Sequence, residues 1–127
     1  MLFKFPKDDR NFSWTSHVKN KMIFYRISEQ KIKSILRSPD RKEEGIAPNT
    51  SAAMKRNDKP SKKEELWVMY ATGTNNNKEK TDTEEKQPKL GGKKMRIISA
   101  WRYPGISPKG NNIPIPHDIQ DELAGML

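Results

Sequence analysis

Two apolar segments on either side of a long polar one constrain the fold of this chain most strongly. Residues 66–72 and 95–103 are rich in aromatic and branched residues, which is typical of strands. Between them, residues 73–94 contain Leu90 as their only aliphatic or aromatic residue. Because that segment is too long for an ordinary connection within a domain, we predict an antiparallel strand pair with residues 73–94 as its flexible polar tip.

A second polar segment, residues 55–65, contains no aliphatic or aromatic residue and also has the composition of a solvated loop. Only 32% of the 127 residues are hydrophobic, and nearly all of them lie outside the two polar segments. The remainder suffices for one modest core. We therefore predict a single domain over residues 1–103 with loops at 55–65 and 73–94, followed by a tail over residues 104–127.

Composition also excludes several classes of protein. The chain has no run of about 20 apolar residues that could span a membrane. Its first residues lack the apolar stretch of a secretory signal, so we expect a cytoplasmic protein that does not associate with membranes. The absence of cysteine excludes disulfides, thiolate catalysis and cysteine-based zinc sites. We expect neither a cofactor nor a metal site.

Two short helices are predicted near the N-terminus. The first begins after Thr15 or Ser16 as N-cap, and Val18, Met22 and Tyr25 then share one face. Ser28 is the N-cap candidate of the second helix, whose apolar residues are Ile32, Ile35 and Leu36. The second helix ends at Ser38, because a residue that precedes proline disfavours helical geometry.

Weaker strand candidates follow at residues 43–47 and 51–54, with Pro48 and Asn49 as the turn between them. Residues 2–5 or 12–14 are candidates for an edge strand. The segment 104–116 is rich in proline and glycine and is predicted to be irregular, and residues 118–126 form a short helix capped by Asp118. The order of elements predicts an α+β fold, with a helical hairpin packed on a sheet of three or four mainly antiparallel strands.

Alternation along the last strong strand assigns its side chains to two faces. Ile97, Ser99 and Trp101 are predicted on one face. Arg96, Ile98, Ala100 and Arg102 are predicted on the other.

Two stretches of the chain resemble known families. Residues 14–22 (Trp-Thr-Ser-His-Val-Lys-Asn-Lys-Met), with Ile27-Ser28 and Ser38-Pro39 further on, resemble a family of small uncharacterised domains. Residues 95–102 (Met-Arg-Ile-Ile-Ser-Ala-Trp-Arg) resemble the last core strand of BrnT-type toxins. Both families are similar to the broad RelE-like set of bacterial ribonuclease toxins, which implies a RelE/BrnT-like fold and metal-free cleavage of RNA.

The chain departs from these patterns at several positions. Lys21 stands where the first family commonly has Arg, and Tyr25-Arg26 stands where an Arg-Gly pair is usual. Trp101 replaces the first Arg of the toxin strand. These departures bear on catalytic activity more than on the fold.

Candidate site residues follow from the chemistry of metal-free RNA cleavage, which needs an acid, a base and cations around the phosphate. His17 titrates near neutrality, and Lys21 lies one helical turn after it on the same face. Arg102, at the end of its strand, completes the predicted catalytic set. For RNA binding we predict cations that contact phosphates and rings that stack on bases, namely Arg41, Lys55, Arg56, Tyr70, Arg96 and Trp101.

Two functions remain open at this stage. In the first, the chain is an endoribonuclease-like toxin whose partners are RNA and an acidic antitoxin protein. In the second, it is a non-catalytic module that binds nucleic acid or protein on the same fold. The net charge of +9 suits a polyanionic partner in either case. Each candidate residue also has a plain structural alternative, such as a capping histidine, a solvated lysine or a core tryptophan.

Overall fold

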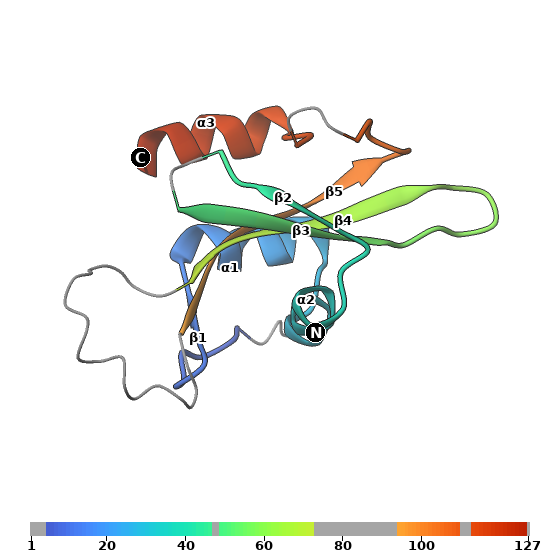
Figure 1. The fold of residues 1–127 in the computed structure, drawn as a ribbon. Helices are drawn as coiled ribbons and strands as arrows, with labels where there is room; N and C mark the ends of the chain where they lie inside the picture. Colours follow the sequence, from blue (N-terminus) through green and yellow to red (C-terminus); the bar gives the residue numbers. More distant parts are fainter. Residues whose placement is uncertain (1–4, 47–48, 73–93, 110–112, 127) are drawn as a thin grey trace.

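Three helices and a five-stranded mixed sheet make up the structure, a computed structural model that describes residues 5–46, 49–72, 94–109 and 113–126, with side chains to 124 (Figure 1). The α+β class is as predicted. Helices α1 and α2 lie on one side of the sheet and α3 lies on the other. The elements in chain order are β1 (Phe12–Trp14), α1 (Ser16–Tyr25), α2 (Glu29–Arg37), β2 (Arg41–Glu44), β3 (Thr50–Arg56), β4 (Glu64–Thr72), β5 (Met95–Pro104) and α3 (His117–Met126).

The strand order in the sheet is β1-β5-β4-β3-β2. Strands β2 to β5 are antiparallel neighbours, whereas β1 runs parallel to β5. The sheet has one strand more than the predicted three or four, and this strand, β1, is the edge strand that was proposed as a candidate at residues 12–14. Strands β4 and β5 pair antiparallel as predicted, but the tip between them lies outside the described residues except for Lys94. The predicted strand at residues 2–5 likewise lies outside them except for Phe5, which is not in a strand.

Several strand boundaries differ from those predicted. Strand β2 begins at Arg41 and ends at Glu44, earlier than the predicted 43–47. The predicted polar loop 55–65 is shorter in the structure, because Lys55 and Arg56 end β3, and Glu64 and Glu65 begin β4. The two glutamates are buried, and the composition of this segment did not reveal the partners that permit it.

A β-bulge in β5 overturns the predicted alternation of its side chains. Met69 pairs with Ser99 and Tyr70 pairs with Ile97, so Ile98 is an additional residue in β5. A bulge of this kind shifts the residues on either side of it relative to the two faces. Ile97 accordingly packs with Ala100 in one core, and Trp101 packs in the other.

Helices α1 and α2 cover one face of the sheet and form the first core. Thr15 caps α1 by accepting a hydrogen bond from the Val18 N–H at 3.0 Å. Ser28 caps α2 in the same way through the N–H of Lys31. The buried residues of the two helices and of the connection between them pack against one face of β3, β4 and β5, and they are Val18 and Met22 in α1, Ile27 in the connection, and Ile32 and Ile35 in α2.

A second core lies on the opposite face, beneath α3. Ile119 and Leu123, at i and i+4 of α3, are fully buried against Trp67 and Trp101. The two tryptophans are direct cross-strand partners, and their rings stack with centroids 6.3 Å apart. Segment 104–127 thus packs on the sheet in its described parts. Helix α3 begins at His117, so Asp118 lies in its first turn and is not the N-cap. None of the described helices has the length and apolar character needed to cross a membrane.

Candidate functional site

Helix α1 lies along the part of β5 that β1 leaves unpaired. Strand β1 reaches only to Ile97, and the chain then turns so that Thr15 bonds both to Ile97 and, through its hydroxyl, to the carbonyl of Ile98 at 2.8 Å. In a helix, residues four positions apart lie on the same face. His17, Lys21 and Tyr25 occupy these positions and face α3.

These three side chains meet two carboxylates of α3. His17 contacts Ser99 Oγ through Nε2 at 2.7 Å and Glu122 Oε1 through Nδ1 at 3.0 Å. Lys21 Nζ donates to Asp118 Oδ2 at 2.9 Å and to Glu122 Oε2 at 3.0 Å. The Tyr25 hydroxyl donates to Asp118 Oδ1 at 2.9 Å. We call this group the α1–α3 cluster, which comprises His17, Lys21, Tyr25, Ser99, Asp118 and Glu122.

Electrostatics fix the protonation states within the α1–α3 cluster. Burial lowers the pKa of His17, and the nearby Glu122 opposes this only in part. Burial acts in the same direction on the pKa of Lys21, but the hydrogen bonds that Lys21 donates to Asp118 and Glu122 outweigh it and raise that pKa. Burial and the bond to Asp118 raise the pKa of Tyr25. Near neutral pH the imidazole is therefore mainly neutral, the ammonium is charged and the phenol keeps its proton.

The arrangement joins α3 to α1 and covers His17 and Lys21, two of the three predicted catalytic residues. His17 and Lys21 are brought together as predicted, but Lys21 is only 7% exposed and each of its two carboxylate partners comes from α3. Sequence reasoning missed the participation of Tyr25, Asp118 and Glu122. The available signal was the i, i+4 pair of acids in the C-terminal helix, which has the spacing to face an i, i+4 pair of basic groups.

The third predicted catalytic residue, Arg102, bonds to the backbone at the C-terminal end of α1. Its Nε donates to the carbonyl of Tyr25 at 2.6 Å and its NH2 group to that of Arg26 at 3.0 Å, where α1 ends. Its NH1 group pairs with Glu64. The guanidinium has no hydrogen bond or ion pair with His17 or Lys21, so the structure does not unite the three predicted catalytic residues.

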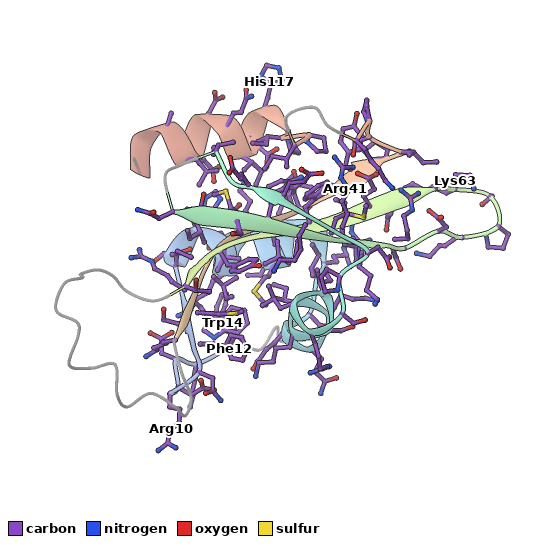
Figure 2. All side chains as sticks on the ribbon, in the orientation of Figure 1. Arg10, Phe12, Trp14, Arg41, Lys63 and His117 are labelled. Carbon is purple, nitrogen blue, oxygen red and sulfur yellow. The ribbon has the colours of Figure 1, made fainter. Side chains whose placement is uncertain are left out.

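Two of the predicted RNA-binding cations hold the segment after β5. Arg41 donates to Ser107 Oγ at 2.8 Å and to the carbonyl of Pro108 at 3.1 Å, and it lies over the ring of Trp67. Arg56 donates to the carbonyl of Gly105 at 3.3 Å and pairs with Asp58 and with Glu65. In Figure 2, Arg41 lies among the side chains on the α3 side of the sheet.

Glu65 is the centre of this second network. It is fully buried and accepts hydrogen bonds from Trp67 Nε1 at 2.9 Å, from the Ser107 N–H at 2.9 Å and from Ser107 Oγ at 2.8 Å. Burial alone would raise the pKa of Glu65, but these bonds outweigh it and lower that pKa. The carboxylate is thus ionised and joins β4 to the tail.

The other predicted RNA-binding residues divide between buried and exposed positions. Tyr70 and Trp101 belong to the two cores, and Trp101 has no exposed surface, so neither ring face is open to a base. Lys55 donates to the carbonyl of Ser38, at the C-terminal end of α2, at 2.8 Å. Only Arg96 is exposed and lacks a hydrogen bond or ion pair with any described residue.

In the part of the chain that the structure describes, acidic side chains have hydrogen-bond or ion-pair partners more often than basic side chains do. Among the acidic residues that the structure describes, only Glu44 and Asp121 lack a hydrogen bond or ion pair to a described residue. Most basic residues in the same parts of the chain lack one. Those that lack one and are exposed include Lys59, Lys62 and Lys63 in the β3–β4 hairpin and Lys7, Arg10 and Arg96 near β1. Figure 2 shows Lys63 and Arg10 at opposite ends of the molecule.

The hairpin lysines were not among the predicted site residues. Their signal in the sequence was the placement of Lys59, Lys62 and Lys63 around Pro60-Ser61, in a segment without apolar residues.

The described residues contain no group of three His, Cys, Asp or Glu side chains arranged to hold a metal ion. Comparison of the chain with protein-family models, curated proteins and solved structures finds no match.

Proposed function

We propose that this protein is a nucleic-acid-binding module that does not cleave its ligand. One observation carries the proposal: among the residues that the structure describes, most acidic side chains have a hydrogen-bond or ion-pair partner, whereas most basic side chains have none. The net charge of the whole chain is +9, and basic side chains without an internal partner are available to contact a polyanion. A polyanion gains from such a surface, because each phosphate contact releases condensed counterions.

The positions of the predicted catalytic residues support the non-catalytic part of the proposal. General acid–base catalysis needs a group within hydrogen-bond reach of the proton that it transfers. Both ring nitrogens of His17 already have partners, as do Lys21 and Arg102. The internal contacts of these residues stabilise α1 and α3 and engage the polar groups that catalysis would need.

The test is a salt titration of binding combined with a cleavage assay. Fluorescence anisotropy with labelled RNA and DNA should give a logarithm of affinity that falls linearly with the logarithm of salt concentration. The same RNA, incubated with the protein and run on a denaturing gel, should remain intact. An affinity indifferent to ionic strength would refute the binding proposal, and RNA cleavage would refute the non-catalytic part.

A second candidate function is an RNA-cleaving toxin, as the resemblance to RelE-like toxins implies. The observation that favours it is the α1–α3 cluster, in which a histidine, a lysine and a tyrosine share one helix face and contact carboxylates of α3. In this case α3 must leave the cluster before RNA can enter, and an acidic antitoxin is the expected partner.

This candidate has its own test. Expression of the Asp118→Asn/Glu122→Gln variant, which weakens the hold of α3, should arrest bacterial growth and cleave RNA more than the wild type. Adding His17→Ala to that variant should abolish both effects. The neighbouring reading frame should encode a small acidic protein. Normal growth and intact RNA with a folded Asp118→Asn/Glu122→Gln variant would count against the toxin.

A further inference from the structure

The end of the β3–β4 hairpin extends beyond the rest of the sheet (Figure 1). Strand β2 pairs with β3 only as far as Met54, and β5 pairs with β4 only as far as Glu64. Residues 57–63 therefore continue as a ribbon with no further strand beside it in the described residues; Lys59 and Lys62 form its one β-bridge, and the Gly105 N–H bonds to the carbonyl of Lys63 at its base at 2.8 Å. At about 3.4 Å per residue, the three residues from Arg56 to Lys59 extend the ribbon by roughly 10 Å.

This ribbon is held in one conformation by its own hydrogen bonds. Lys59 and Lys62 exchange two backbone bonds, at 2.7 and 3.0 Å, around the Pro60-Ser61 turn. The N–H of Asn57 bonds to the carbonyl of Glu64 at 3.0 Å, and its side chain bonds to the Glu64 carboxylate at 2.6 Å. Because the element is preformed, ordering it on ligand binding costs little conformational entropy.

Charge at the ribbon is strongly positive, although its sequence contains acids. The carboxylate of Asp58 is paired with Arg56, and that of Glu64 is buried and paired with Arg102. In contrast, the side chains of Lys59, Lys62 and Lys63 are exposed and have no hydrogen bond or ion pair with a described residue. Three positive charges are thus concentrated at the end of a narrow projection.

The shape and the chemistry together select the kind of nucleic acid. The major groove of B-form DNA is about 12 Å wide and about 8.5 Å deep and admits a two-stranded β-ribbon. The major groove of A-form RNA is too narrow for side chains to read. Residues 57–63 contain no aromatic side chain, whereas single strands are bound largely by stacking on aromatic rings.

We infer that the β3–β4 hairpin is a DNA-binding arm that enters the major groove of duplex DNA and contacts its phosphates through Lys59, Lys62 and Lys63. The inference rests on the proposed nucleic-acid-binding function and assigns a surface and a ligand to it. Lysine contacts to phosphates carry no sequence information, so this arm binds duplex DNA of any sequence.

Two variants of equal charge test the inference. In Lys59→Gln/Lys62→Gln/Lys63→Gln the arm loses its three charges. In the control Lys7→Gln/Arg10→Gln/Lys94→Gln the same charge is removed near β1, at the other end of the molecule, from exposed residues that are not among the predicted site residues. The full chain is titrated by fluorescence anisotropy against a labelled DNA duplex, the matching RNA duplex and the single strand, each of roughly 20 nucleotides, at about 50 to 200 mM salt.

Wild-type protein should prefer the DNA duplex. The arm variant should lose about 2.7 from the magnitude of the salt slope, since each phosphate contact contributes roughly 0.9. The ratio of the wild-type affinity for the DNA duplex to the affinity of that variant should then fall roughly 40-fold across the fourfold rise in salt. The control variant should keep the wild-type slope for the most part.

Contrary results separate the inference from the proposed function. Equal losses in the two variants, or preference of the wild type for RNA or for single strands, would overturn the DNA-binding arm while nucleic-acid binding stands. Absence of binding to all three probes would overturn the arm and the proposed function together. Circular dichroism of the two variants should match the wild type, because all six side chains are exposed.

Discussion

Replacing Glu65 by alanine should destabilise the protein by roughly 3–6 kcal/mol. The substitution removes the acceptor of three buried donors, namely Trp67 Nε1, the Ser107 N–H and the Ser107 hydroxyl. A buried donor left without a partner costs about 1–3 kcal/mol, and water entering the new space would keep the sum below its upper limit. Since a domain is stable by only about 5–15 kcal/mol, the loss would be a large part of the total.

The assay is equilibrium urea unfolding followed by circular dichroism and by tryptophan fluorescence. Glu44→Ala is the matched control, because Glu44 is exposed and has no hydrogen bond or ion pair with a described residue. It should change stability by no more than about 0.5 kcal/mol. The stability of Glu65→Gln should lie between those of the two alanine variants, since the amide keeps one acceptor oxygen but places an N–H donor toward Arg56 or Ser107. If Glu65→Ala unfolds at the same urea concentration as Glu44→Ala, the buried network does not anchor the tail.

Three further predictions concern the second core and α1. Leu123→Ala should cost about 2–5 kcal/mol in urea unfolding, whereas a loss equal to that of exposed Asp121→Ala would mean that α3 does not pack on the sheet. The left-handed backbone of Arg26, with φ 59°, predicts that Arg26→Gly raises stability by about 0.5–1 kcal/mol, and a lower melting temperature would contradict this. Because burial holds the pKa of His17 below 6.5, the wild type should lose stability as pH falls from 6.5 through the folded pKa. His17→Gln should lose less stability than the wild type between about pH 7 and about pH 5. Identical losses would show that His17 is not the group responsible.

The sequence by itself determined most of the local structure. Caps at Thr15 and Ser28 and the proline after Ser38 set the bounds of α1 and α2, because these signals act within a few residues of the backbone that they satisfy. The apolar runs at 66–72 and 95–103 specified the two central strands, and the spacing of Ile119 and Leu123 specified α3. The positive charge was likewise evident from composition.

Only the tertiary structure decided which side chains are available for function. A single additional residue in β5 placed Ile97 and Trp101 in different cores, and no local pattern marks such a bulge. Asp118 lies 97 residues after Lys21, so the partner that engages the predicted catalytic lysine could not be read from its neighbours. The same holds for Glu65, whose burial depends on Ser107, 42 residues later. Long-range pairing of charges is set by how elements pack, and that packing buries His17 and Lys21, pairs Arg102 with Glu64 and leaves the hairpin lysines exposed.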